Sequence, residues 1–424
     1  MVLRASSSKL MRTSAVVLGG SGLILAGAFM TAPANAATPS PTVSSINASN
    51  NSYGVAVGNG DVYVTSTFGG TVTEINTTTN QPVGNPITVG SGPTSAALAS
   101  NGDLYVVNSG SNSVSVIDTA TNKVVGSPIS VQLNPWAIAI ASNGDAYVTN
   151  GLSNSVSVIN TTNNQPVGSP IPVGKDPQGI AIASNGDAYV ANALSNSVSV
   201  INTTNNQPVG KPIPVGNEPN DIAIAPNGNA YVTNSLSSIQ NVTQGTVSVI
   251  NTTNNQPVGT PITVGNEPQG IAIGPNGDAY VANTKDNTVS VIDTTTNQVV
   301  GAPIAVGQGP AGVAVIPNGN VYVGDSGNGS TTVSLLQYAS TTTPSTTTPS
   351  TTTPSTTKPG TTTVSTTPTA GSPSAAGPSV NTGGTTAAAF STPLGAGLLG
   401  VGSLLLLGAA SVLLIARRNR TTQQ

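Results

Sequence analysis

Residues 179–215 read GIAIASNGDAYVANALSNSVSVINTTNNQPVGKPIPV, and this stretch decides the fold. Short runs of alternating apolar and polar residues, separated by turn residues, predict four strands at 179–183, 188–192, 197–201 and 211–215. Asn185-Gly186 between the first two predicts a hairpin turn, because Asn-Gly accepts positive φ. Four short antiparallel strands cannot bury both of their faces alone, but they can when they stack radially against neighbours. The unit is therefore expected to be one blade of a β-propeller.

The same unit recurs seven times along the chain. Its tyrosines, at positions 63, 105, 147, 189, 231, 280 and 322, lie 42 residues apart, with one spacing of 49. The longer spacing falls in the fifth copy, where seven extra residues stand around Ser237–Gln244. We therefore predict an all-β, seven-bladed β-propeller of four-stranded antiparallel blades.

The seventh copy lacks its fourth strand, which predicts how the ring closes. Three strands are expected at 312–316, 320–323 and 332–338, and a Thr/Pro-rich stretch then follows. Residues near 42–48 stand before the first copy at the distance that outer strands keep elsewhere. We expect this N-terminal segment to complete the last blade, giving one domain over residues 42–338.

The phrase Tyr-Val-Thr-Asn within a 42-residue repeat resembles the YVTN β-propeller repeat family. The resemblance covers residues 42–338 through Tyr-Val-x-Asn, Asn-Gly-Asp and Val-Ile-Asn/Asp-Thr. It implies a bacterial or archaeal exported or surface protein. It is specific for the fold and weak for function, because related propellers include lactonase-like enzymes, haem- or copper-linked reductases and binding modules.

The two ends of the chain predict export and anchoring. Residues 1–36 combine a basic start, an apolar stretch and Ala34-Asn35-Ala36, which is typical of a cleaved signal peptide. Residues 339–390 form a Thr/Ser/Pro-rich segment that we expect to be a disordered stalk, suited to O-glycosylation. Residues 394–416 carry no charge and are long enough for a transmembrane helix, and the basic tail 417–424 is expected to stay cytoplasmic. No LPxTG sortase motif precedes the apolar run, so a retained membrane anchor is favoured.

Composition excludes several kinds of chemistry. The sequence holds no histidine and no cysteine, which rules out Ser-His-Asp and Cys-His nucleophiles, copper clusters, and haem held by histidine or cysteine. All 14 acidic residues lie within 42–338, together with four lysines and no arginine, so this region has a net charge of −10. That charge opposes nucleic acid as a partner.

Candidate binding residues are sought where copies differ, because the repeat itself explains what copies share. The loops leading into the first strand of each copy vary and should surround one mouth of the axial channel. They and the residues that follow supply these candidates: Trp136, Asp176, Gln178, Glu218, Asn220, Asp221, Glu267 and Gln269. Neutral drift of exposed loops is the alternative explanation. The Asn-Gly-Asp and Asn-Thr-Thr motifs recur in step with the repeat, so they are interpreted as turns.

Two functional hypotheses follow. The first is a surface-anchored binding or envelope-structural module without a cofactor, monomeric, that recognises a protein or glycan at the cell surface or wall. The second is a calcium-dependent lactonase- or esterase-like hydrolase in which Glu218, Asp221 and Glu267 hold Ca²⁺ through oxygen. No general base is evident in the sequence, so the binding module is favoured.

Overall fold

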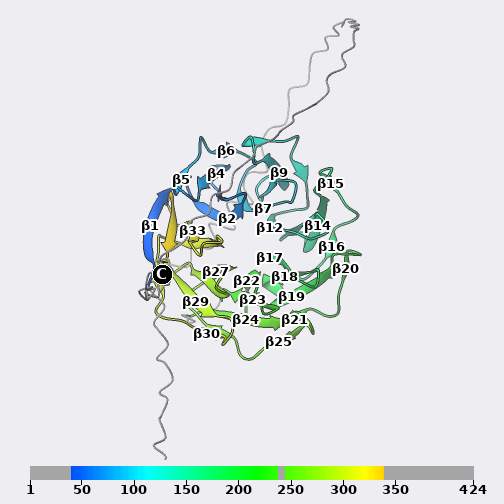
Figure 1. Ribbon diagram of the computed structural model, residues 1–424. Coiled ribbons are helices and arrows are strands. Elements are labelled where there is room, and N and C mark those ends of the chain that lie inside the picture. The colour runs from blue at the N-terminus through cyan, green and yellow to red at the C-terminus, as the bar shows by residue number, and fades with distance from the viewer. Residues whose placement is uncertain (1–39, 237–243, 339–424) are drawn as a thin grey trace, which may run out of the picture. The chain divides into compact units, whose positions relative to one another are not determined.

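Each copy of the 42-residue repeat forms one antiparallel sheet, and seven such sheets, here called blades, form a ring (Figure 1). The structure is a computed structural model, and it describes residues 40–236 and 244–338. Blades 1 to 7 begin with the innermost strands β2 (Ser52–Gly58), β7 (Pro93–Leu98), β12 (Pro135–Ile140), β17 (Pro177–Ile182), β22 (Pro219–Ile224), β27 (Pro268–Ile273) and β32 (Pro310–Val315). These strands start about two residues before the predicted position, because their first residue, proline in blades 2 to 7 and Ser52 in blade 1, pairs with the second strand and a β-bulge follows it.

The second and third strands are the buried middle of each blade. The second strands are β3 (Asp61–Ser66), β8 (Asp103–Asn108), β13 (Asp145–Asn150), β18 (Asp187–Asn192), β23 (Asn229–Asn234), β28 (Asp278–Asn283) and β33 (Val321–Asp325). The third strands are β4 (Thr71–Asn76), β9 (Ser113–Asp118), β14 (Ser155–Asn160), β19 (Ser197–Asn202), β24 (Thr246–Asn251), β29 (Thr288–Asp293) and β34 (Thr332–Gln337). In blade 4 a 3₁₀ turn, η1 (Ala193–Ser195), joins them.

The outer strand of blades 1 to 6 differs from the prediction, because it is split into two short pieces. Both pieces pair with the third strand of their blade, and proline, which lacks an N–H donor, is frequent in and beside them. The pairs are β5 (Gln81–Pro82) and β6 (Ile87–Thr88), β10 (Lys123–Val124) and β11 (Ile129–Ser130), β15 (Gln165–Pro166) and β16 (Ile171–Pro172), β20 (Gln207–Pro208) and β21 (Ile213–Pro214), β25 (Gln256–Pro257) and β26 (Ile262–Thr263), and β30 (Gln298–Val299) and β31 (Ile304–Ala305). Because the outer edges are broken, they present few consecutive backbone groups with which a strand of another chain could pair.

The N-terminal strand closes the ring, as the sequence predicts. β1 (Thr42–Asn47) pairs antiparallel with β34, from Thr42 opposite Gln337 to Asn47 opposite Thr332. An apolar cluster joins every pair of neighbouring blades, including Tyr322 and Leu335 of blade 7 with Val62 and Val64 of blade 1. The seventh cluster makes the ring continuous.

The repeated tyrosine locks neighbouring blades together. Tyr147 is fully buried, and its hydroxyl donates to the carbonyl oxygen of Thr203 and to Oδ1 of Asn206 in the next blade, at 3.1 and 2.6 Å. At the closure, the hydroxyl of Tyr322 donates to Oδ1 of Asn80, at 2.5 Å. Tyr105, Tyr189 and Tyr231 make the same pair of bonds to the next blade, whereas Tyr63 donates to Glu74 of its own blade. The tyrosine that marks the repeat in the sequence therefore fastens five of the seven blades to the next one.

The Asn-Gly-Asp turns are confirmed as turns, with a change in their geometry. The glycines have positive φ, 87° at Gly186, but the preceding asparagine does so only at Asn59 in blade 1. In blade 4, Oδ1 of Asn185 accepts the backbone N–H of Asp187 at 3.0 Å. The asparagine therefore closes the turn through its side chain.

The expected signal peptide (1–36), stalk (339–390), membrane anchor (394–416) and basic tail (417–424) lie outside the described residues. Within residues 40–236 and 244–338, no helix has the length and apolar character needed to cross a membrane.

Candidate functional site: the mouth face of the propeller

The antiparallel blades give the ring two different ends. The mouth face carries the loops that lead into the inner strands and the turns between second and third strands. The turn face carries the Asn-Gly-Asp turns and the loops that follow the third strands. The register places Pro135, where an inner strand begins, opposite Asn150, where the second strand ends, so both belong to the mouth face.

Each loop on the mouth face holds one residue in the left-handed backbone conformation. This residue directly precedes the inner strand and has φ between 48° and 64° at Asn51, Gly92, Asn134, Asp176, Glu218, Glu267 and Gly309. Glycine, asparagine and aspartate suit this conformation, whereas other side chains cost about 1 kcal/mol or more. Two predicted site residues, Glu218 and Glu267, therefore occupy positions whose backbone favours another residue, which points to a role for their carboxylates. Asp176, a third predicted residue, suits its position.

Aromatic and amide side chains meet on the axis of the ring. They occupy the second position of five inner strands, as Tyr53, Trp136, Gln178, Asn220 and Gln269, whereas blades 2 and 7 carry Thr94 and Ala311 there. The rings of Tyr53 and Trp136 pack edge to face, with centroids 5.7 Å apart. The hydroxyl of Tyr53 also donates to Oε1 of Gln269, at 3.2 Å. Blades 1, 3 and 6 are thus linked across the axis, and four predicted residues, Trp136, Gln178, Asn220 and Gln269, lie in this ring.

Sequence reasoning missed Tyr53, although a signal was present. Tyr53 occupies in blade 1 the repeat position that Trp136 occupies in blade 3. Aligning the first copy by its inner strand would have placed two aromatic residues at one level of the axis.

Asp221 is a structural link between two blades. The neighbouring blades have glycine at the same position, Gly179 and Gly270. There is little room for a side chain at this position, since a methyl group on Gly270 would overlap the carbonyl oxygen of Ala311. Oδ1 of Asp221 accepts the N–H of Ile222 at 2.9 Å, and Oδ2 accepts the N–H of Ile271 in blade 6 at 3.2 Å. Burial raises the pKa of Asp221 to about 6, against the opposing effect of these two hydrogen bonds.

The three carboxylates of the hydrolase hypothesis do not form a metal-binding group by themselves. Among the described residues, no three acidic side chains gather closely enough to hold a metal ion. Glu267 forms an ion pair with Lys285, and both oxygens of Asp221 accept backbone N–H groups. Glu218, Asp221 and Glu267 lie on adjacent blades, as predicted, but do not converge on one point.

The mouth face also carries the most exposed large apolar side chains among the described residues. Phe68, Leu133, Leu152 and Leu194 are 59%, 55%, 61% and 68% exposed, whereas the remaining exposed ones are valines of 39–43% on β1 and in or beside the outer strands. Three of the four stand in the turn between the second and third strands, where blades 2 and 7 have glycine. The sequence showed that this turn position varies between blades, but the exposure of these residues became evident only from the structure.

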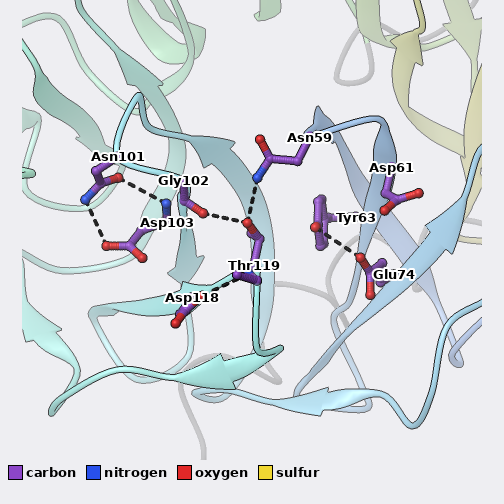
Figure 2. Close-up of a pocket in the computed structure, with 10 residues that line it drawn as sticks. Asn59, Asp61, Tyr63, Glu74, Asn101, Gly102, Asp103, Asp118 and Thr119 are labelled. Carbon is purple, nitrogen blue, oxygen red and sulfur yellow. Dashed lines mark hydrogen bonds between the residues drawn. The ribbon is translucent and has the colours of Figure 1, made fainter. Parts of the chain in front are cut away.

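A hollow of about 460 Å³ lies on the turn face between blades 1 and 2 (Figure 2). Glu74 lines it and is only 6% exposed, at a position where other blades carry valine or leucine. Tyr63 donates to Oε1 of Glu74 at 3.2 Å, and Nδ2 of Asn122 donates to Oε2 at 2.5 Å. Burial raises the pKa of Glu74. The other carboxylates that line the hollow serve turns: Oδ1 of Asp118, for example, accepts the N–H of Ala120.

Comparisons with known proteins agree with the fold. The NHL repeat family model matches residues 308–330. Among curated proteins, no relative matches the chain. Hydrazine synthase of Kuenenia stuttgartiensis is similar at 19% identity and TM-score 0.59, covering 75% of this chain and 99% of that one. Virginiamycin B lyase of Staphylococcus aureus is similar at 15% identity and TM-score 0.59, covering 70% and 99%. The WD40 propeller domain of Doa1 is similar at 14% identity and TM-score 0.59, covering 72% and 98%.

At these identities the similarity concerns the fold alone, and the three structures serve unlike purposes. Seven blades, a repeat period of 42 residues and the NHL match are together consistent with a repeat β-propeller family.

Proposed function

We propose that the protein is a binding module whose mouth face recognises a partner outside the cell. The observation that carries this proposal is that the four most exposed large apolar side chains of the described residues all lie on the mouth face, around the Tyr53–Trp136 pair. Exposed aromatic and apolar groups gathered on one surface are typical of interaction sites. The wide use of propellers as protein-interaction domains also supports a binding role.

We further propose that the propeller is exported and held at the cell surface by the apolar segment 394–416, with the stalk 339–390 as a spacer. The signal-like start and the arginines after the apolar segment support this topology. Protease treatment of intact cells tests it. Digestion of the propeller from outside is expected, and full protection of the propeller would refute the orientation.

The partner is proposed to be a protein or glycan of the envelope, with the propeller acting as a monomer. The net charge of −10 over residues 42–338 argues against nucleic acid. A neutral set of aromatic and amide groups on the axis, Trp136, Tyr53 and Gln269, offers stacking and hydrogen bonding to either class of partner.

The test is binding of the purified full-length protein to envelope fractions of the producing organism. The variant Trp136→Ala is expected to lose binding, while Asp118→Asn on the turn face retains it. Asp118→Asn is a matched control because blade 3 carries Asn160 at the same position. Equal binding by both variants would refute recognition through the mouth face.

A further inference from the structure

We infer that the partner presents a polypeptide segment that combines apolar and basic side chains, and that this segment crosses the mouth face from blades 3 and 4 to blade 6. This inference rests on the proposed function and names the chemistry of its partner. Its basis is an uneven surface: three exposed leucines stand on blades 3 and 4, where Lys175 and Asp176 are the charged residues of the mouth face, whereas blades 5 and 6 carry an excess of carboxylates.

The apolar side is built by paired loops on blades 3 and 4. On blade 3 the N–H of Leu133 donates to Oγ of Ser153 at 3.0 Å, and the N–H of Gly151 donates to the carbonyl oxygen of Asn134 at 2.8 Å. These bonds hold Leu133 beside the turn that carries Leu152.

Blade 4 repeats the arrangement of blade 3. The N–H of Leu194 donates to the carbonyl oxygen of Lys175, at 3.2 Å. Three leucines, each more than half exposed, are therefore presented by hydrogen-bonded loops, which reduces the entropy that a partner's binding must overcome.

The acidic side lies on blades 5 and 6. Glu218, Glu267 and Asp286 stand there with a single lysine, Lys285, which pairs with Glu267. Asp286 is fixed in place, because its two oxygens accept the N–H and Nδ2 of Asn266 at 2.7 and 2.8 Å. The net negative charge of this side, within a ring of net charge −10, favours lysine or arginine in the partner.

The axis connects the two sides. Trp136 of blade 3 packs against Tyr53 of blade 1, and the hydroxyl of Tyr53 donates to Gln269 of blade 6. An extended segment that reaches from Leu152 to Glu267 would therefore pass over Trp136 and Tyr53, where aromatic contacts add to its affinity. Trp136 is the sole tryptophan in the sequence, so its fluorescence reports on this point alone.

The experiment titrates the purified full-length protein with a short synthetic peptide of alternating leucine and lysine, read by Trp136 emission. The same peptide with glutamate in place of lysine is the charge control. The leucine–lysine peptide is expected to bind at least about tenfold more tightly than the leucine–glutamate peptide, because a charge difference of this kind is worth about 1.4 kcal/mol or more. Its affinity should fall as salt is added.

Variants locate the binding. Leu152→Ser combined with Leu194→Ser, and separately Glu267→Gln, are expected to weaken binding of the leucine–lysine peptide by about tenfold. Val125→Ser, an exposed apolar change beside an outer strand, and Asp118→Asn on the turn face should leave binding unchanged. Circular dichroism confirms that each variant is folded.

Equal binding of the two peptides, or equal weakening by the mouth-face and control variants, overturns the inference. A different outcome is that neither peptide changes Trp136 emission but a chitin-derived oligosaccharide does, and that calorimetry shows weaker oligosaccharide binding by Trp136→Phe. In that case the inferred polypeptide partner is wrong, while recognition by the mouth face stands. If the envelope test also shows no dependence on Trp136, the proposed function falls together with this inference.

Discussion

Replacing Asp325 with asparagine should make the ring more stable at neutral pH and remove part of its pH dependence. Five blades carry asparagine at this position, and its Nδ2 donates to a serine of the third strand, as Asn150 does to Ser157 at 3.0 Å. Blade 7 carries Asp325 instead, with no exposed surface. Its carboxylate accepts hydrogen bonds from Thr332 at 2.7 Å and from Ser334 at 3.0 Å.

The magnitude follows from the pKa of this carboxyl group. Desolvation by burial raises the pKa of Asp325 to about 6, although the bonds from Thr332 and Ser334 oppose the rise. An unfolded aspartate has a pKa of about 3.9, so the folded state binds the proton more tightly, and the pKa difference of about 2 corresponds to about 3 kcal/mol. The stability that protonation confers is complete below about pH 4 and is lost as the pH rises through about 6.

The assay is urea unfolding of the wild type and Asp325→Asn at pH 4 and pH 8. At pH 8 the variant should be more stable by up to about 3 kcal/mol, because it replaces an ionised buried carboxylate by a neutral amide. At pH 4 the two proteins should be similar, since Asp325 is then largely protonated. Asp221, whose pKa is also raised to about 6, contributes in the same direction to both proteins and cancels in the difference. A variant that is less stable than the wild type at pH 8, or a difference that does not change with pH, would refute the reasoning.

Three further changes test packing and closure, each by thermal unfolding. Glu74→Val restores the residue type of other blades and lets the hydroxyl of Tyr63 reach Oδ1 of Asn122, an atom that is buried and has no hydrogen-bond partner. We expect the variant to be more stable by about 1–2 kcal/mol, and a less stable variant would contradict this reasoning. Tyr322→Phe removes the hydrogen bond to Asn80 across the closure and should lower the free energy of unfolding by about 1–2 kcal/mol. An unchanged stability would mean that this bond does not help to hold the ring closed. Gly270→Ala places a methyl group against the backbone of blade 7 and should cost about 1–3 kcal/mol; an unchanged melting temperature would show that the inner strands do not touch.

The fold was predictable because the signal is repeated. A tyrosine phrase every 42 residues sets the blade, and the missing fourth strand of the last copy requires the N-terminal strand that pairs with β34. The split outer strands were not predicted, because alternation alone does not show where proline interrupts a ladder. The asparagine of the Asn-Gly-Asp turn was assigned positive φ, whereas its side chain supplies the turn.

The site was predictable only in part, because contacts across the axis join residues far apart in sequence. The variable loops correctly indicated Trp136 and Gln269 as facing one mouth, but not that Tyr53 connects them. Glu218, Asp221 and Glu267 were the ligands of the alternative calcium hypothesis because they lie on two adjacent blades, yet among the described residues no three acidic side chains form a group that could hold a metal ion. Distance around a ring depends on the radius at which a residue lies, and sequence spacing does not give that radius.

Positions that vary between copies divide into buried ones that affect stability and exposed ones that are available to a partner. Asp325 and Glu74 replace the common residue at buried positions, Asp325 in the blade that closes the ring and Glu74 at the interface between blades 1 and 2. Leu152 and Leu194 are exposed at a turn position that varies between blades, with glycine in blades 2 and 7 and lysine in blade 6. Because distant sites without shared partners contribute independently, closure and recognition can vary separately in this architecture. A repeat protein can therefore acquire a binding surface by changing a few turn residues, while the buried tyrosines that fasten its blades remain unchanged.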